Sequence, residues 1–545
     1  MSARQRVAVV TGGGGGIGGA IAEELGRGGW FVVTVDPLVT LDGTEELPEP
    51  TTTTAGRIVA AGGSARASSA SVTDGAALRS LFEELAHEHG GLDAVVNVAG
   101  ITRQSYLARG TEEDWQALLS VHLGGYLNVL DAALPLMAES GHGRVVGVTS
   151  GSGWRAADAG GYSCAKRAVA ALTWQLGRRA PTGVTVNALS PIANTRMVAA
   201  ALERARQEGR TGGGGGLTLD SMPGPEQLGP LGAHLVDDGF GWCTGQVVFA
   251  SGPEVAIVEQ PRLMEVVRTT GAVSLRALVH AFVPRALVKA EAKQASAGGG
   301  NPRFASIFDA PAPDPTPAQA TKSCVVVLDG RAQLEAPLLA ALEARSFACH
   351  RVGSGRGFDG AADTLRAVAD AEGPVDAVVI ALDGHRPSSS TNGGWESILA
   401  DHRGLVEHLH ADAAWARATA EYAARADRPV QLMTLTDATT PGGKSRAQAA
   451  DQLARAAASG TAGRVTAFAA SIEAPDAGTG PVVGELVGHL LTDPQAAALA
   501  GAELVVGPGW LGLRSHPRPV GTVTYGGPAV PAWLDDTLRE MVGAP

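Results

Sequence analysis

Three polar side chains in the first half of the chain have the types and the spacing of a proton-transfer site. Tyr162 and Lys166 are four residues apart, so on a helix they would share a face, and Ser150 precedes Tyr162 by twelve residues. A free tyrosine has a pKa near about 10, and a nearby ammonium group would favour the phenolate and lower that pKa. Tyr162 could then take the proton of an alcohol while hydride leaves its carbon, with Ser150 hydrogen-bonded to the reacting oxygen. We predict that all three are catalytic; the alternative for the Tyr-x-x-x-Lys pair alone is a solvated helix face.

A glycine-rich turn near the start of the chain could bind a dinucleotide. Gly12, Gly16 and Gly18 follow a short apolar strand and precede a helix, and such a turn lets backbone N–H groups and a helix N-terminus approach a pyrophosphate. Asp36 stands 18 residues beyond Gly18, at the end of the next predicted strand. Its carboxylate could accept hydrogen bonds from both ribose hydroxyls and would repel a 2′-phosphate, and no arginine stands near it in the sequence. The sequence therefore favours NAD over NADP.

The elements that must position these residues alternate between strand and helix. The predicted strands are Val7–Val10, Trp30–Val35, Ala94–Val98, Arg144–Thr149, Val184–Ala188 and Gly245–Ala250. The predicted helices are Ala20–Gly26, Ala76–His89, Glu112–Glu139 and Tyr162–Arg179. This alternation is typical of a doubly wound, Rossmann-type α/β fold with a parallel sheet. Residues 37–56 are expected to be a loop insertion, and residues 198–230, with the glycine run in 211–216, either a flap over a pocket or a plain linker.

The second half repeats this framework without its chemistry. Gly-Gly-Tyr-Ser-Cys-Ala-Lys166 aligns with Gly-Gly-Lys-Ser-Arg-Ala-Gln448, so Lys444 and Gln448 stand where Tyr162 and Lys166 stood. The matching segments come in the same order at offsets near 280 residues. Leu334 and Ala336 replace the later glycines of the turn, and bulky side chains would block a close approach of phosphate. We therefore expect one working active site and one degenerate copy that holds no dinucleotide.

These motifs resemble those of the short-chain dehydrogenase/reductase family, over about residues 5–250. Asn97-Val-Ala-Gly100 resembles the family's Asn-Asn-Ala-Gly element, Ser71-Val-Thr-Asp74 its adenine-side element, and Pro191-Ile-Ala-Asn-Thr195 the segment that holds the nicotinamide amide. The resemblance implies that the cofactor contacts Gly12, Gly16, Ile17, Gly18, Asp36, Asp74, Asn97, Ala99, Gly100, Tyr162, Lys166, Pro191, Ile192 and Thr195.

The fourth catalytic position of the family departs from its usual pattern. The family has an asparagine there that supports a water relay to the lysine, and this chain has His122 in a Val-His-Leu context. An imidazole can also hydrogen-bond water, so a relay role survives in modified form. The alternative is that His122 is only structural, and the sequence leaves both readings open.

Within the family, the chain is most similar to the (3R)-hydroxyacyl-CoA dehydrogenase units of multifunctional β-oxidation enzymes. The resemblance rests on the insertion after Asp36 with Leu41-Asp42-Gly43, on the Val-His-Leu run, on Thr195-Arg196-Met197 and on the segment 507–512. It implies a secondary alcohol or ketone of a 3-hydroxyacyl or 3-oxoacyl thioester of CoA or carrier protein as substrate. Two alternatives stay open: a ketoreductase or hydroxysteroid-type dehydrogenase for a polycyclic steroid or polyketide, and a non-catalytic scaffold or binding protein.

Composition bounds the remaining expectations. The chain has 545 residues and a net charge of −12, which argues against a nucleic-acid partner. Its four cysteines are scattered without metal-ligand spacing, so we expect no metal site and a cytoplasmic protein. No apolar run approaches the ~18 residues of a membrane span. The basic amphipathic segment Leu275–Lys293 would serve packing between the halves, or less plausibly a membrane surface.

We predict a catalytic NAD-binding domain at 1–260, an extension and linker at 261–320 and a degenerate dehydrogenase-like domain at 321–545. Members of this family commonly pair through the helices before and after the catalytic strand. The two halves should therefore pair in the same way within one chain as a pseudodimer, and a further homodimer stays open.

Overall fold

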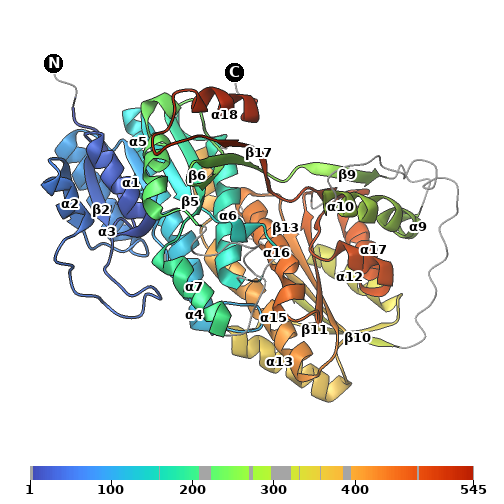
Figure 1. The fold of residues 1–545 in the computed structure, drawn as a ribbon. Coiled ribbons are helices and arrows are strands. Elements are labelled where there is room, and N and C mark those ends of the chain that lie inside the picture. The colour runs from blue at the N-terminus through green and yellow to red at the C-terminus, as the bar shows by residue number, and fades with distance from the viewer. Residues whose placement is uncertain are drawn as a thin grey trace.

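The computed structural model describes all residues except 1–3, 157, 159, 208–221, 269–273, 296–320, 331, 356, 384–393, 475–477 and 544–545. Two sheets form the centres of two α/β domains that lie side by side (Figure 1). The predicted fold class is confirmed, because both sheets are mainly parallel and carry helices on both faces. The glycine run in 211–216 and the predicted linker after residue 296 lie outside the described residues.

The first domain surrounds a nine-stranded sheet in the order β17-β8-β7-β6-β5-β4-β1-β2-β3. Its strands are β1 (Val7–Thr11), β2 (Phe31–Val35), β3 (Ser64–Ser68), β4 (Ala94–Asn97), β5 (Gly143–Val148), β6 (Val184–Ile192), β7 (Val247–Ser251), β8 (Glu254–Glu259) and β17 (Arg518–Thr524). Its helices are α1 (Gly16–Arg27), α2 (Thr54–Ala60), α3 (Gly75–His89), α4 (Glu112–Leu119), α5 (Gly125–Ser140), α6 (Gly160–Gly177), α7 (Arg196–Gln207), α8 (Gly229–His234) and α18 (Leu534–Val542). The central strands are runs of buried apolar residues, as expected for parallel strands covered on both faces.

The second domain surrounds an eight-stranded sheet in the order β11-β10-β12-β13-β14-β15-β16-β9. Its strands are β9 (Leu263–Arg268), β10 (Lys322–Asp329), β11 (Phe347–Val352), β12 (Ala377–Leu382), β13 (Val430–Asp437), β14 (Val465–Ile472), β15 (Glu503–Gly507) and β16 (Trp510–Arg514). Its helices are α9 (Leu275–Phe282), α10 (Val288–Ala295), α12 (Ala332–Glu343), α13 (Gly357–Glu372), α14 (Trp395–Asp401), α15 (Leu405–Arg425), α16 (Pro441–Gly460) and α17 (Thr479–Thr492). From β11 to β9, the strands follow the same order as β2 to β17 in the first sheet.

The two sheets exchange their last edge strands. β9 follows the strands of the first domain in the sequence, yet it pairs antiparallel with β16 of the second sheet. β17 follows the strands of the second domain, yet it pairs antiparallel with β8 of the first. Figure 1 shows β17 with α18 on the N-terminal domain and β9 on the C-terminal domain. Each domain is therefore completed by a segment from beyond the other half.

The predicted pseudodimer is present, and its centre is the antiparallel pair α6 and α16 (Figure 1). The Sγ of Cys164 lies 3.7 Å from the carbonyl oxygen of Ala449, and Gln175 donates to Ser445 Oγ at 3.0 Å. Helices α4 and α5 face α15 and α14 beside this pair. One hydrophobic cluster runs through both halves and buries Trp115 and Trp415 together. The interface is thus a continuous core and not two touching surfaces.

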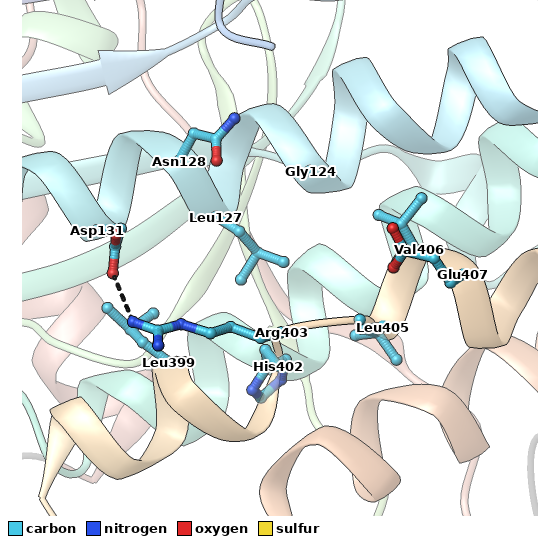
Figure 2. Close-up of a pocket in the computed structure, with 11 residues that line it drawn as sticks. Gly124, Leu127, Asn128, Asp131, Leu399, His402, Arg403, Leu405, Val406 and Glu407 are labelled. Carbon is cyan, nitrogen blue, oxygen red and sulfur yellow. Dashed lines mark ion pairs between the residues drawn. The ribbon is translucent and has the colours of Figure 1, made fainter. Parts of the chain in front are cut away.

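A cavity of about 270 Å³ lies in this interface, between α5 and the corner that joins α14 to α15. Figure 2 shows Arg403 reaching across it to Asp131, with 3.7 Å between the guanidinium and the carboxylate. Leu127 and Leu399 lie on its opposite walls. It contains none of the predicted site residues, so it is separate from the candidate active site.

One helical stretch among the described residues, Glu112–Ser140, is long and apolar enough to cross a membrane. Of its most apolar 18 residues, 61% are buried, and the stretch packs on the core and on the second domain. Burial within the protein therefore accounts for its apolar composition.

Two sequence expectations need correction. The insertion predicted at 37–56 is a loop only up to Thr53, because the Thr53 side chain caps α2 by accepting a hydrogen bond from the Gly56 N–H at 2.9 Å. The basic segment from Leu275 packs its apolar side onto the core of the second domain, with Leu278, Val279 and Leu287 buried there. It therefore serves that domain and does not lie between the halves.

Candidate active site

The glycine turn lies between β1 and α1, and its shape depends on two glycines. Gly12 has a φ of +64°, and a Cβ there would lie 2.8 Å from the backbone nitrogen of Ala99. Gly18 lies so close to this turn that a Cβ would come within 2.3 Å of the Gly12 carbonyl oxygen. Above Gly16, in contrast, the space is open. The turn therefore packs tightly against the sheet below and leaves room for a ligand at the start of α1, which fits a pyrophosphate.

Asp36 lies at the end of β2, beside the glycine turn. Its two carboxylate oxygens accept hydrogen bonds from the N–H groups of Gly14, at 3.1 Å, and Leu38, at 3.0 Å. A carboxylate has about four acceptor positions, so each oxygen can accept a further hydroxyl proton. The side chain is partly exposed. This arrangement fits a ribose diol, as the sequence predicts.

Arg196, at the start of α7, comes near the same turn, which the sequence analysis did not foresee. A Cβ built on Gly15 would lie 3.7 Å from its Nη2 atom, and the guanidinium is exposed. An arginine beside the N-terminus of a helix could bind a phosphate together with the backbone N–H groups. The sequence signal was weak, because Arg196 follows β6 and lies 180 residues from the turn.

Hydrogen bonds between the ends of β1 and β4 position the next group of predicted residues. Thr11 and Asn97 are both buried, with 2.7 Å between Thr11 Oγ1 and Asn97 Oδ1. The N–H of Ala99 donates to the same Thr11 oxygen at 3.3 Å. Beyond it, a Cβ on Gly100 would lie 2.5 Å from His122 Cε1, so the missing side chain makes room for the imidazole. This contact ties Gly100 to the proposed catalytic histidine.

The four predicted catalytic residues converge at the carboxyl ends of β4 and β5. Tyr162 and Lys166 lie on α6, and Lys166 Nζ is 5.7 Å from the centre of the Tyr162 ring. The Tyr162 hydroxyl is hydrogen-bonded to Ser150, which follows β5. The His122 ring meets the Tyr162 ring edge to face, with 5.0 Å between their centres. Three segments of the chain therefore place a phenol, a hydroxyl, an amine and an imidazole around one point.

The electrostatics of this site differ from one sequence expectation. Lys166 donates a hydrogen bond of 2.7 Å to the Val148 carbonyl oxygen, and burial lowers the pKa of Lys166 to about 7. Burial also raises the pKa of Tyr162, and its hydrogen bond to Ser150 opposes this only in part. The expected lowering of the Tyr162 pKa is therefore wrong for this arrangement: the lysine is bonded to a backbone carbonyl instead of the phenol, and desolvation disfavours the phenolate.

His122 sits in a π-helical turn, Ser120–Gly124, that interrupts the long helix between α4 and α5. Such single turns often mark functional sites in helices. His122 Nε2 lies 2.9 Å from the Ile101 carbonyl oxygen, while the buried Nδ1 has no hydrogen-bond partner among the described residues. Burial, followed by the charge of Lys166, lowers the pKa of His122 well below its ordinary value. The imidazole is therefore neutral, with one nitrogen ready for a water molecule.

The remaining predicted cofactor residues occupy three places. Pro191, Ile192 and Thr195 lie at the end of β6 and before α7, and the Thr195 hydroxyl accepts a hydrogen bond from the Val198 N–H at 3.3 Å. Asp74 is exposed and caps α3, where one of its oxygens accepts hydrogen bonds from the N–H groups of Ala76 and Ala77. In this structure Asp74 is a helix cap, and both of these N–H groups donate to Oδ1 and not to Oδ2. Ile17 is half-buried within the turn of α1.

The aligned positions of the second half have different surroundings. Lys444 is exposed at the start of α16. Gln448 accepts a hydrogen bond of 2.9 Å from the guanidinium of Arg167, which also pairs with Glu503 at 2.6 Å. Leu334, in place of a turn glycine, is buried in the core of the second domain. Of these three residues, only Gln448 contacts the other half, through its bond to Arg167.

Comparisons with known proteins agree with this geometry. The family model described as short chain dehydrogenase matches residues 6–206. The short-chain reductase protein NovJ of Streptomyces niveus is 31% identical over 254 residues, which are 46% of this chain and 94% of that protein. Hydroxyacyl-CoA dehydrogenase ChsB1 of Mycobacterium tuberculosis is 32% identical over 273 residues, 47% of this chain and 81% of that protein.

One solved structure is similar over both halves. The N-domain of a bacterial malonyl-CoA reductase with NADP covers 89% of this chain and 95% of its own, with a TM-score of 0.63 and 16% identity. At this identity the likeness concerns the fold alone, and it extends to the paired arrangement of two α/β units. Together with the relatives of the first half, the glycine turn and the catalytic group, it leads to one conclusion. This chain belongs to the short-chain dehydrogenase family, whose members bind a nicotinamide cofactor.

Proposed function

We propose that this chain is an NAD-dependent oxidoreductase that interconverts the secondary alcohol and the ketone of a 3-hydroxyacyl or 3-oxoacyl thioester. The observation that carries the proposal is the convergence of Ser150, Tyr162, Lys166 and His122 beside a glycine turn with Asp36. The bound nicotinamide would donate or accept the hydride. The residues of the chain supply binding, orientation and the proton.

Tyr162 is the proton donor to the reacting oxygen. Because burial raises its pKa, the phenol is protonated at neutral pH and can give its proton to a carbonyl oxygen as hydride adds to the carbon. Ser150 is bonded to the same hydroxyl and can donate to the same oxygen. In the oxidation direction the proton passes back to Tyr162, which must first lose its own. At neutral pH Tyr162 is therefore in the protonated form that ketone reduction needs.

We assign His122 as the relay that returns a proton toward Lys166. Its unpartnered Nδ1 is suited to hold one water molecule. His122→Asn keeps a group that can bind water and is expected to retain turnover within about tenfold, whereas His122→Leu should lose about a hundredfold in kcat. The measurement is steady-state kinetics with melting temperatures of both variants. Wild-type turnover in a folded His122→Leu protein would show that this histidine is only structural.

The choice of NAD rests on Asp36. Its free acceptor positions suit a ribose diol, and its charge opposes a 2′-phosphate. Arg196 is placed to bind the pyrophosphate instead, beside Gly15. In this proposal the Asp36 carboxylate contacts the ribose, and the Arg196 guanidinium contacts the pyrophosphate.

The thioester substrate is proposed from the relative named for hydroxyacyl-CoA dehydrogenation, together with the sequence resemblance to β-oxidation units. The domain division at 1–260, 261–320 and 321–545 stays part of the proposal, with β9, α9 and α10 packing on the second domain and β17 on the first. We regard the second half as a degenerate dehydrogenase unit without a cofactor. A cytoplasmic location, a CoA or carrier-protein thioester as the ligand and a further homodimer complete the proposal.

The test is reduction of NAD and of NADP by the full chain with matched panels of 3-hydroxyacyl-CoA thioesters and hydroxysteroids. We expect thioester turnover with a kcat/KM for NAD at least about tenfold above that for NADP, a difference of about 1.4 kcal/mol. Turnover of ring alcohols alone would replace the thioester with a polycyclic substrate. A preference for NADP would refute the role of Asp36, and tight NAD binding without any turnover would favour a binding protein.

A further inference from the structure

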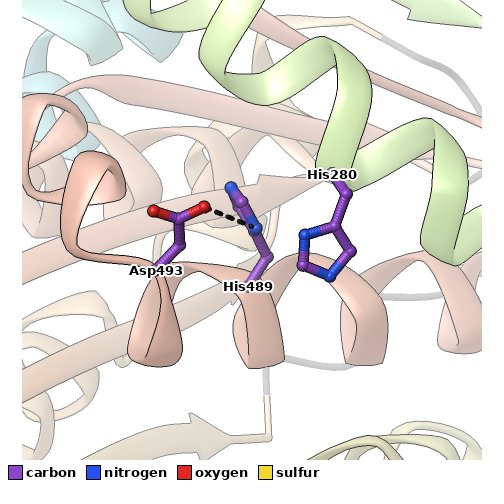
Figure 3. Close-up of side chains that lie close together, drawn as sticks. All are labelled: His280, His489 and Asp493. Carbon is purple, nitrogen blue, oxygen red and sulfur yellow. Dashed lines mark ion pairs between the residues drawn. The ribbon is translucent and has the colours of Figure 1, made fainter. Parts of the chain in front are cut away.

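Two histidines and one aspartate meet in the second domain, far along the chain from the catalytic residues. His280 comes from α9, His489 from the last turn of α17, and Asp493 from the residue that ends α17 (Figure 3). One ligand atom of each lies within 4.8 Å of the other two. His489 and Asp493 are four residues apart on one helix face, and His280 faces them across the helix pair.

The imidazoles of this cluster lack the partners that buried polar groups normally have. His489 is fully buried, and neither ring nitrogen has a hydrogen-bond partner among the described residues. The buried Nε2 of His280 has no partner there either. Nearly all buried polar atoms in folded proteins are paired, so three orphaned ring nitrogens around one point need an explanation. A bound cation would satisfy one nitrogen of each imidazole.

The carboxylate is arranged to complete such a site. One oxygen of Asp493 accepts the N–H of Gln495 at 2.8 Å and so caps the following 3₁₀ turn, Pro494–Leu499. The other oxygen lies 3.7 Å from His489 Nδ1. Ligand atoms of a tetrahedral zinc ion, with bonds of about 2.0–2.1 Å, stand about 3.3 Å apart. A small closure of these side chains would therefore accommodate the ion, and partly exposed Asp493 gives it a way in.

We propose that His280, His489 and Asp493 bind one divalent transition-metal ion of the zinc class, which fastens α9 to α17. Two imidazoles and a carboxylate suit zinc and leave one position for water. Burial lowers the pKa of both histidines, that of His489 to about 4, so both offer neutral nitrogens at pH 7. Arg345 and Arg276 both carry positive charge near His280, and that of Arg345 is compensated by its ion pair of 2.5 Å with Glu485.

The spacing of the three ligands along the sequence does not reveal this site. His280 and His489 are 209 residues apart, and the sequence therefore predicted no metal site. Only the packing of α9, which belongs to the extension after the first half, onto α17 brings them together. The ion would thus anchor the segment that follows the exchanged strand β9.

The test uses the full chain, free of any affinity tag and stripped with a chelator. Zn²⁺ is titrated in competition with a chromophoric chelator, and Co²⁺ is added as a spectroscopic probe. The variants are His280→Gln and Asp493→Asn, the second of which keeps the capping oxygen for Gln495. His87→Gln, an exposed histidine of the first domain, is the matched control.

We expect one Zn²⁺ per wild-type chain, visible ligand-field bands with Co²⁺, and a melting temperature that rises with Zn²⁺. His280→Gln and Asp493→Asn should each weaken Zn²⁺ affinity by at least about tenfold and remove the bands, while His87→Gln behaves as wild type. If one variant fails to fold, the other decides. Absence of stoichiometric binding in the wild type, or wild-type affinity in both variants, would overturn the proposal.

Discussion

Tyr162 is the residue on which the chemistry depends, and its surroundings favour the protonated phenol. The side chain is held between Ser150 and the edge of the His122 ring, while Lys166 turns its ammonium toward the Val148 carbonyl oxygen. Desolvation therefore acts on the phenol without a compensating positive charge at bonding distance. The pKa of Tyr162 in the free protein lies above its ordinary value of about 10.

This pKa predicts opposite pH dependences for the two directions of the reaction. Ketone reduction needs the phenol, so its kcat/KM should be flat through neutral pH and fall only above the raised pKa. Alcohol oxidation needs the phenolate, so its kcat/KM should rise about tenfold per pH unit from about pH 6 to about pH 10. The measurement is a pair of pH profiles of kcat/KM, which report the free enzyme. An oxidation profile that levels off below about pH 7 would mean that Lys166 lowers the Tyr162 pKa after all.

At the scale of elements, α6 carries both the catalysis and the domain pairing. One face presents Tyr162 and Lys166 to the site, and the next residue, Arg167, points into the interface with α16. The side chains of Arg167 and its partner Glu503 are at most 1% exposed. Burial would raise the pKa of Glu503, but the charge of Arg167 and the contacts of His516 lower it to about 2. A buried pair of this kind costs most when only one partner is removed.

Arg167→Met should therefore lower the free energy of unfolding by about 3–5 kcal/mol, because it leaves the Glu503 carboxylate buried with a weaker set of partners. The double variant Arg167→Met/Glu503→Gln should lose less than the sum of the two single changes. The measurement is urea unfolding followed by tryptophan fluorescence. Arg464→Met is the matched control, since its ion pair with Asp427 is exposed and worth at most about 1 kcal/mol. Equal stability of Arg167→Met and Arg464→Met would contradict this role.

The buried apolar strands β1 and β4, and the helix α3 with its Asp74 cap, were predictable from the sequence. The glycine turn and the Tyr162–Lys166 pair were predictable because a few adjacent residues define them. The side-chain contacts were not: the Lys166 bond to Val148 and the fit of His122 under Gly100 depend on tertiary packing. The π-helical turn at His122 also leaves no signature in an otherwise regular apolar pattern.

At the scale of the whole molecule, the exchange of edge strands makes the two domains depend on each other. Neither β9 nor β17 was predicted. Both are largely exposed, so neither shows the buried apolar run of a central strand, and each pairs with a strand from the other half of the chain. The C-terminal helix α18 then buries Leu534 and Leu538 in the core of the first domain, where it contacts β8 and β17. The last residues of the chain therefore support the cofactor-binding domain.

Leu538→Ala should accordingly destabilise the first domain, although it lies more than 500 residues from the glycine turn in sequence. Removing a fully buried leucine side chain costs about 2–5 kcal/mol. Thermal unfolding with and without NAD reports the effect, and we expect a lower melting temperature that NAD partly restores. Trp533→Ala, at an exposed position of the same segment, should stay near wild type. A Leu538→Ala protein as stable as Trp533→Ala would show that α18 adds nothing to the domain.

The most direct test of the account compares Tyr162→Phe with Lys444→Ala, the change at the equivalent position of the second half. The measurement is NAD-linked turnover of a 3-hydroxyacyl-CoA thioester, with NAD affinity determined on the same samples. We predict that Tyr162→Phe loses about 10²–10⁴-fold in kcat with nearly unchanged NAD affinity, because it removes the transferred proton and little else. Lys444→Ala should leave turnover unchanged. Wild-type turnover in Tyr162→Phe, or a comparable loss in Lys444→Ala, would contradict a single active site in the first half.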